Sequence, residues 1–305
     1  MKIKGIHAAP ALIIIISALI AASNYLDISK ISGGDNPYLT VMALEIACIG
    51  IPAVFFCILR GNDYKGRLNI KLMRARHTTL SFYALILIIS GSIALSIFLY
   101  WLMPETFAAS ASAGLRGSLE STGMTDTVYA ALAFGVLPAI LEEFLFRGVV
   151  MAEYSPYGGT VAVIFSTLLF SLMHFTPVRL PIYLFTGTVL GMTVGATRSV
   201  ISTSLIHAVY NVFTLYFEKY IYKIAAKQSG GMILLAFIVV TVLLFSAVLF
   251  FGRCEKIYRN MGADNVPSPL RRKKKPGDPP AFLAALLSPT FLLLAVFYCI
   301  AVLIF

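Results

Sequence analysis

Residues 127–146 read TVYAALAFGVLPAILEEFLF, a run of apolar residues whose only charged members are two adjacent acids, Glu142 and Glu143. A helix needs about 20 mainly apolar residues to cross the hydrocarbon core of a bilayer, and this stretch has that length. A carboxylate at the centre of such a helix costs roughly 2.5 to 3.5 kcal/mol on insertion scales. Acids kept at that cost usually serve chemistry or transport, so this segment predicts both the fold class and the place of a site.

The rest of the chain repeats the apolar pattern. Hydrophobic residues make up 59% of the 305 residues and charged residues 12%, about half the charged fraction of a soluble globular protein. We expect an all-α, polytopic transmembrane helix bundle with about nine spans, at residues 6–26, 37–59, 78–103, 127–146, 159–178, 180–197, 199–217, 231–252 and 281–305. The first resembles a signal peptide, but its apolar run is longer than a typical signal core, and we interpret it as a retained span.

The spans divide the chain into three parts. Residues 1–126 hold three spans and an outer loop, residues 127–217 hold spans four to seven with all the polar motifs, and residues 218–305 hold two spans and a basic loop at 253–280. The longest connector is too short for a large soluble domain. Whatever this protein does must therefore happen in or at the membrane.

Lysine and arginine positions predict the orientation. Placing the N-terminus in the cytoplasm puts most of the 24 basic residues on the cytoplasmic side, as the positive-inside rule requires. We interpret the run from Arg271 to Lys275 as an anchor for anionic headgroups of membrane lipid and expect no nucleic acid as a partner. The four cysteines are scattered and predict neither a zinc cluster nor a disulfide framework. We expect a multi-pass protein of the cell membrane.

The motif Glu142-Glu143-x-x-x-Arg147 indicates how the two acids differ. Residues four apart share a helix face, whereas adjacent residues diverge, so Glu143 faces Arg147 and Glu142 does not. We predict an internal ion pair between Glu143 and Arg147 that leaves Glu142 as a candidate general base. The structural alternative is that both acids only close the cytoplasmic end of the span. Glu45, in the second span, has no motif around it, and we interpret it as structural.

Two further motifs, Phe170-x-x-x-His174 and His207-x-x-x-Asn211, place imidazoles and an amide on other predicted helices. A carboxylate and an imidazole can share a water molecule and take its proton as it attacks a carbonyl, while a second imidazole and an amide donate to the developing oxyanion. This chemistry is peptide-bond hydrolysis without a covalent intermediate. The signatures of serine rhomboid, zinc site-2 and presenilin-type proteases are absent from the sequence.

The three motifs, in this order and on separate membrane helices, resemble the CPBP family, which comprises the type II CAAX prenyl endopeptidases and their prokaryotic bacteriocin-processing and immunity-related relatives. The resemblance covers about residues 127–217. It implies that Glu142 and His174 activate water and that His207 and Asn211 stabilise the oxyanion, with no metal needed. It also implies an eight-helix core and a site open to the cytoplasm, which agrees with the orientation argued from charge. The expected partner is a membrane-associated peptide or protein substrate, possibly with a prenylated C-terminus.

Two other classes of function stay open. A zinc hydrolase would use Glu142, His174 and His207 as ligands with water in the fourth position. A proton-coupled carrier or a non-enzymatic scaffold would use the same groups as a relay or as internal struts. The depths predicted for Glu142 and His174 do not match unless the turn at residues 177–181 is sunk into the protein. The stripe of Gly187, Gly191 and Gly195 predicts close approach of a neighbouring helix.

Overall fold

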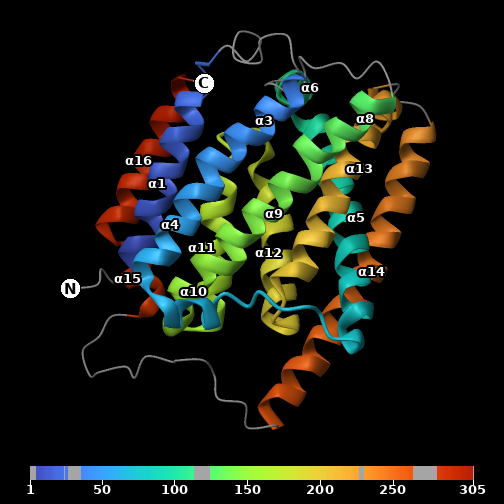
Figure 1. Cartoon of the computed structure of the whole chain (residues 1–305). Coiled ribbons are helices and arrows are strands. Elements are labelled where there is room, and N and C mark those ends of the chain that lie inside the picture. The colour runs from blue at the N-terminus through green and yellow to red at the C-terminus, as the bar shows by residue number, and fades with distance from the viewer. Residues whose placement is uncertain are drawn as a thin grey trace.

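The fold was described from a computed structural model, which covers residues 5–23, 25–26, 36–112, 124–226, 230–263 and 280–304. Within these ranges the chain is a bundle of helices without a strand, which confirms the predicted all-α fold (Figure 1). The basic run from Arg271 to Lys275 lies outside the described residues, so its role as a lipid anchor stays a prediction.

The helices follow the chain as an up-and-down bundle. Their bounds are α1 (Gly5–Ser23), α3 (Pro37–Glu45), α4 (Ile51–Arg60), α5 (Thr78–Leu102), α6 (Pro104–Ser112), α8 (Met124–Ala131), α9 (Leu137–Glu143), α10 (Met151–Tyr154), α11 (Gly159–Leu172), α12 (Leu180–Thr197), α13 (Val200–Ala226), α14 (Gly230–Ala263), α15 (Ala281–Leu286) and α16 (Pro289–Ile304). Three π-helical segments join neighbouring helices into longer rods: η1 (Ile46–Gly50), η4 (Leu132–Val136) and η5 (Phe144–Val150).

Among the described residues, seven rods are long and apolar enough to cross a membrane: Gly5–Ser23, Pro37–Arg60, Ala75–Leu102, Thr125–Tyr157, Pro177–Thr197, Val200–Ile221 and Gly231–Asn260. Two of the nine predicted spans correspond to shorter helices, Gly159–Leu172 and Pro289–Ile304. The last predicted span is broken into α15 and α16 just before Pro289, whose ring cannot continue a helix begun upstream. The chain is a multi-pass membrane protein.

The fourth span was predicted to end near residue 146, and this was wrong. The rod continues through η5 and α10 as far as Tyr157. Arg147 suggested a helix end at the membrane surface, but its side chain is buried at 0% exposure against Glu143. Because an internal partner neutralises the arginine, the helix passes through this point without reaching water.

The fifth span was predicted to reach residue 178, whereas α11 ends at Leu172. Phe175 adopts a left-handed backbone conformation, with φ of 50°, that an α-helix does not permit. We had predicted that His174 lies on the helix, but it lies in the turn beyond α11. The short helix α6 packs over this turn, at η7 (Pro177–Arg179).

The turn at residues 177–181 was predicted to be sunk into the protein. The Arg179 side chain is only 13% exposed, while Pro177 and Pro181 are exposed. The prediction is therefore confirmed for Arg179 but not for the two prolines that flank it.

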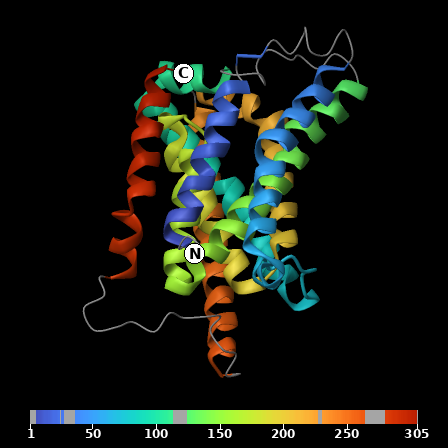
Figure 2. The ribbon, with the colours of Figure 1, turned by 60° about the vertical axis from the view of Figure 1, so that its left-hand side comes forward.

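The polar motifs sit where helices approach closely. α12 packs along α11, and a Cβ added at Gly187 or Gly191 would lie 3.0 Å or 3.1 Å from side chains of that helix, which confirms the predicted close approach. On the other side, α13 packs against η4 and α9, and Gly135 has no room for a side chain because its Cβ would lie 2.7 Å from Val212. The rod of α3 and α4 runs beside α8 and α9 (Figure 2).

Candidate active site

Glu143 and Arg147 form the ion pair that the sequence predicted, and it lies at the centre of the candidate site. Arg147 Nη1 donates to Glu143 Oε1 over 2.7 Å, and both side chains are fully buried. Arg147 Nη2 also donates to the carbonyl of Gly187 over 3.1 Å. Arg147 lies in the π-helical segment η5, an irregularity that often marks functional sites. The arginine thus ties the fourth membrane rod to α12.

Glu143 also orients His207, a contact that the sequence did not predict. His207 Nδ1 lies 3.0 Å from Glu143 Oε1. Because an ionised carboxylate only accepts hydrogen bonds, Nδ1 carries the hydrogen of this contact. The opposite nitrogen, Nε2, lies 3.7 Å from Glu142 Oε2. Glu143 therefore orients the His207 imidazole so that its Nε2 faces Glu142.

His174 is held by the last turn of the preceding helix, α11. Its Nδ1 lies 2.9 Å from the carbonyl oxygen of Phe170. A carbonyl can only accept, so Nδ1 donates and the neutral ring keeps a lone pair on Nε2. The ring also stacks on Tyr183 with a centroid separation of 3.9 Å. Both contacts fix the direction of Nε2, the nitrogen that a general base would use.

Phe170 explains the aromatic position of its motif. Its ring lies under the Arg147 guanidinium at 4.6 Å and packs edge-on to His174 at 4.8 Å and His207 at 5.7 Å. One aromatic side chain thus separates two imidazoles and a buried arginine while contacting all three. An aromatic ring serves here because its face attracts a cation and its body is apolar.

Asn211, one turn after His207, reaches the neighbouring rod. Its Nδ2 donates to the carbonyl of Gly135 over 3.4 Å, in the π-helical segment η4. An amide nitrogen has two hydrogens, so this contact leaves a second donor. Asn211 lines the same cavity as both histidines.

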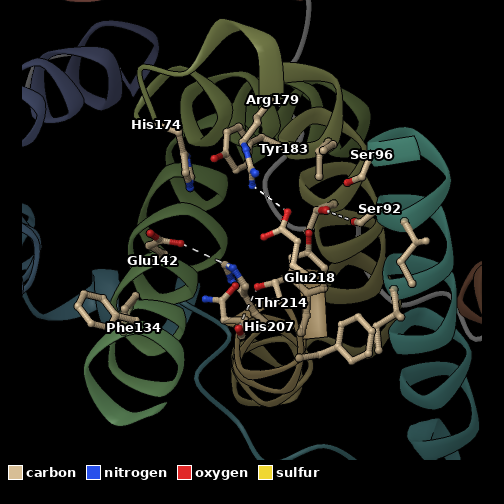
Figure 3. A pocket seen from close by; sticks show the side chains of 18 of the residues that line it. Ser92, Ser96, Phe134, Glu142, His174, Arg179, Tyr183, His207, Thr214 and Glu218 are labelled. Carbon is tan, nitrogen blue, oxygen red and sulfur yellow. Dashed lines mark hydrogen bonds and ion pairs between the residues drawn. The ribbon is translucent and has the colours of Figure 1, made fainter. Parts of the chain in front are cut away.

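Five of the seven motif residues line one cavity of about 260 Å³, namely Glu142, Phe170, His174, His207 and Asn211 (Figure 3). The side chain of Glu142 is 13% exposed, in contrast to the fully buried Glu143. The prediction that the motif residues converge is therefore confirmed. The described lining residues come from five of the rods, from α11 and from the turn after α11: Glu45, Ile89, Ser92, Ile93, Ser96, Phe134, Pro138, Glu142, Phe170, His174, Arg179, Ile182, Tyr183, Thr186, His207, Tyr210, Asn211, Phe213, Thr214, Glu218 and Ile221.

A second ion pair lies farther along the cavity, between Arg179 and Glu218, with Nη1 and Oε1 3.1 Å apart. Arg179 also donates to Ser110 of α6 over 3.1 Å. The cavity therefore extends from Glu142 toward the end of the bundle that carries α6, opposite the basic loop between α4 and α5 (Figure 1). The opening of the site toward the cytoplasm and the cytoplasmic N-terminus both stay predictions.

Sequence reasoning missed three groups that line the cavity. Tyr183 and the pair of Arg179 and Glu218 belong to no motif, and Glu45 was interpreted as structural. A sequence signal existed only for the charged residues, since acids and arginines inside apolar segments are rare. Nothing in the sequence marks Tyr183, because tyrosine is common in membrane helices.

The zinc alternative requires three converging ligands. Among the residues that the structure describes, no group of three or more His, Cys, Asp or Glu side chains is arranged to hold a metal ion. Metal analysis of the purified protein tests the zinc alternative directly.

One family model matches the chain, and its description is type II CAAX prenyl endopeptidase Rce1-like. The match covers residues 124–213, just under a third of the chain, and contains all three motifs. No curated protein and no solved structure matched. The matched segment runs from the start of α8 to two residues beyond Asn211, so it covers the cavity walls made by the fourth rod, α11, α12 and the first half of α13.

Proposed function

We propose that this chain, which belongs to the CPBP family with its type II CAAX prenyl endopeptidases, is an intramembrane endopeptidase that hydrolyses a peptide bond with a water molecule activated by Glu142 and His174. The observation that carries the proposal is the difference between the two adjacent acids. Glu143 is fully buried and its Oε1 accepts from both Arg147 and His207, while Glu142 is partly exposed and lines a cavity. Only an acid left with basic oxygens can take a proton during a reaction.

In the proposed first step, water lies between the Glu142 carboxylate and His174 Nε2. The hydrogen bond from His174 Nδ1 to Phe170 supports this role, because it leaves Nε2 with its lone pair toward the cavity. One proton passes from the water to Glu142 as the oxygen attacks the scissile carbonyl. The same proton then goes to the departing amine, so the carboxylate is restored.

In the proposed second role, His207 Nε2 and Asn211 Nδ2 stabilise the oxyanion. Both side chains are positioned by contacts outside the cavity, His207 by Glu143 and Asn211 by Gly135. Donors that are held in place before the reaction need no reorganisation when charge develops, which lowers the barrier. With Nδ1 bound to Glu143, His207 can donate from Nε2 only when both of its nitrogens carry hydrogen.

The proposed substrate is a membrane-associated peptide or protein cleaved near its C-terminus. The cavity lies among helices that cross the bilayer, and its walls combine apolar side chains with the polar motif residues. A lipid-anchored substrate would reach such a site without leaving the membrane. Whether the substrate carries a prenyl group is decided by the assay below.

The test is cleavage by the full chain reconstituted in lipid vesicles, with a panel of prenylated and unprenylated C-terminal peptides. We expect the wild type to cleave at least one peptide and Glu142→Ala and His174→Ala to lose the activity. Glu255→Ala is the matched control, because Glu255 pairs with Arg259 at the exposed end of α14. Equal cleavage by wild type, Glu142→Ala and His174→Ala would exclude the assigned roles.

Two alternatives have their own tests. Zinc in stoichiometric amount that is lost together with activity on chelation would favour a metal hydrolase with Glu142, His174 and His207 as ligands. A proton-coupled carrier predicts transport that Glu142→Gln changes, without any peptide cleavage by the wild type. A scaffold predicts that Glu142→Gln alters neither.

A further inference from the structure

Glu45 is the one acid of the cavity that no motif includes and no ion pair contacts among the described residues. It ends α3 and is followed directly by the π-helical segment η1. Its Oε2 is buried and has no hydrogen-bond partner in the part of the chain that the structure describes. A polar atom taken from water without a partner lowers stability, so its retention in a membrane rod calls for a ligand.

The packing of two rods places Glu45 close to the proposed base. The rod of α3 and α4 runs beside that of α8 and α9, with Tyr38 against Phe134 at a ring separation of 6.2 Å. Farther along, a Cβ added at Gly50 would lie 3.3 Å from Leu141. Between these two contacts, Glu45 comes level with Pro138, one helical turn before Glu142 and on the wall of the same cavity.

Among the described residues, no donor lies within hydrogen-bond distance of Glu45 Oε2. Pro138, level with it, has no N–H to donate. Across the cavity, the hydroxyl groups of Ser92 and Thr186 lie 3.4 Å apart and bond to each other. Glu142, on the wall of the same cavity, cannot supply a donor while it is ionised. Glu45 as a residue is partly exposed and lines the cavity, so its carboxyl group can accept from a donor that arrives from outside the protein.

A peptide that enters this cavity brings donors of that kind. Every backbone N–H of an extended segment that leaves water needs an acceptor, because the bilayer core offers none. We propose that Glu45 is a substrate-binding residue whose carboxyl accepts a hydrogen bond from a backbone N–H of the substrate, beside the bond that Glu142 attacks. This inference rests on the proposed peptidase function and adds to it a residue that positions the substrate.

The experiment compares Glu45→Ala and Glu45→Gln in the cleavage assay described above, with KM and kcat determined separately. Glutamine keeps an acceptor oxygen of the same reach, and alanine removes it. We expect Glu45→Ala to raise KM about tenfold with kcat little changed, and Glu45→Gln to restore KM to near the wild-type value. Ile46→Ala is the control, because its exposed side chain lies next in the chain outside the cavity.

Thermal unfolding of each variant in detergent tests whether the bundle is intact. This control distinguishes a variant that does not fold from one that folds but binds the substrate more weakly. If Glu45→Ala does unfold, the test depends on Glu45→Gln alone. A tenfold higher KM in Glu45→Gln would contradict the role of Glu45 as a hydrogen-bond acceptor. Unchanged KM in Glu45→Ala, or a fall confined to kcat, would also overturn the inference. Cleavage that is abolished in Glu142→Ala but unaffected in Glu45→Ala would leave the proposed function standing. A wild type that cleaves no peptide would remove both.

Discussion

Two buried glutamates of the fourth rod each pair with an arginine, and only one of these pairs belongs to the candidate site. Glu143 and Arg147 lie in the middle of the bundle, and Glu153 pairs with Arg60 at the end that carries the basic loop. The second region also has the larger cavity, about 360 Å³ against 260 Å³. Neither a buried ion pair nor the size of a cavity therefore identifies an active site in this protein.

The difference lies in what surrounds each pair. Glu143 contacts His207, and His207 in turn contacts Glu142. Both His207 and Glu142 line a cavity that a second imidazole, that of His174, also lines. Near Glu153, side chains donate hydrogen bonds to backbone carbonyl groups at the end of the fourth rod. Tyr64 donates to the carbonyl of Val149 over 3.1 Å, and Arg67 donates to the carbonyl of Ala152. Burial raises the pKa of Tyr64, so its hydroxyl stays protonated as a donor. The first region therefore contains the groups that the proposed mechanism uses to move a proton, whereas the contacts of the second hold the end of a rod in place.

The sharpest test of this comparison is Glu142→Gln, which changes one atom and removes the proposed base. We expect the catalytic rate to fall by about 10²- to 10⁴-fold, the range for loss of a general base. The melting temperature should hold, because Glu142 has no short hydrogen bond in the described structure. The measurements are kcat/KM in vesicles and thermal unfolding in detergent. A fall of twofold or less would remove Glu142 from the mechanism.

Arg147→Met should have the largest effect on stability. Removing one partner leaves the Glu143 charge buried and unpaired, which costs about 3–5 kcal/mol. Cleavage should also be lost, since Glu143 would no longer hold His207 as it does here. Chemical unfolding in detergent measures the first effect and the peptide assay the second.

The double variant Glu143→Gln with Arg147→Met separates packing from chemistry. It removes both charges, and we expect it to recover most of the stability but not the activity. Recovered activity would mean that the pair has only a structural role.

Arg60→Met tests the other region. We expect a loss of about 1–3 kcal/mol, as for a buried acceptor that loses its donor, with the cleavage rate unchanged once the folded fraction is taken into account. Unfolding curves and specific activity are measured on the same preparation. A loss of activity as deep as that of Arg147→Met would show that the two regions do not differ in the way proposed.

Tyr183→Leu should have a smaller effect. It removes an aromatic stack on His174 worth about 0.5–1.5 kcal/mol, so kcat should fall less than about tenfold. Tyr183→Phe keeps the stacked ring and is the matched control, expected to behave like the wild type. Equal losses in both variants would assign the effect to the hydroxyl group and not to the stack.

The smallest expected signal is a labelling rate. A cysteine at Arg179 should react with a water-soluble maleimide more slowly than one at Glu105, because Arg179 is mostly covered and Glu105 on α6 is exposed. Labelling from one side of oriented vesicles also shows on which side of the membrane the α6 end lies. Free labelling at Arg179 would contradict the covered position of the turn.

Much of this molecule could be predicted from local chemistry. The apolar segments of about 20 residues predict the helices, and the spacing of Glu143 and Arg147 predicts their pair, because both depend on neighbours within one helix. The predicted ends of the fourth and fifth spans were wrong because they depend on contacts and backbone angles that the local sequence does not show. The charge of Arg147 was interpreted as a sign that the helix reaches water there, and nothing in the composition indicates the left-handed conformation of Phe175.

Hydrophobic length and helical spacing act along one chain segment, so they are enough to predict the all-α membrane fold, the motif residues and the difference between two adjacent acids. Tertiary structure alone decided that Glu143 holds His207, that Phe170 lies among three charged or titratable groups and that Glu45 lines the cavity. These contacts join residues from different rods. Which faces meet depends on packing between helices, where close approach at Gly135 and Gly187 sets the rotation of each rod.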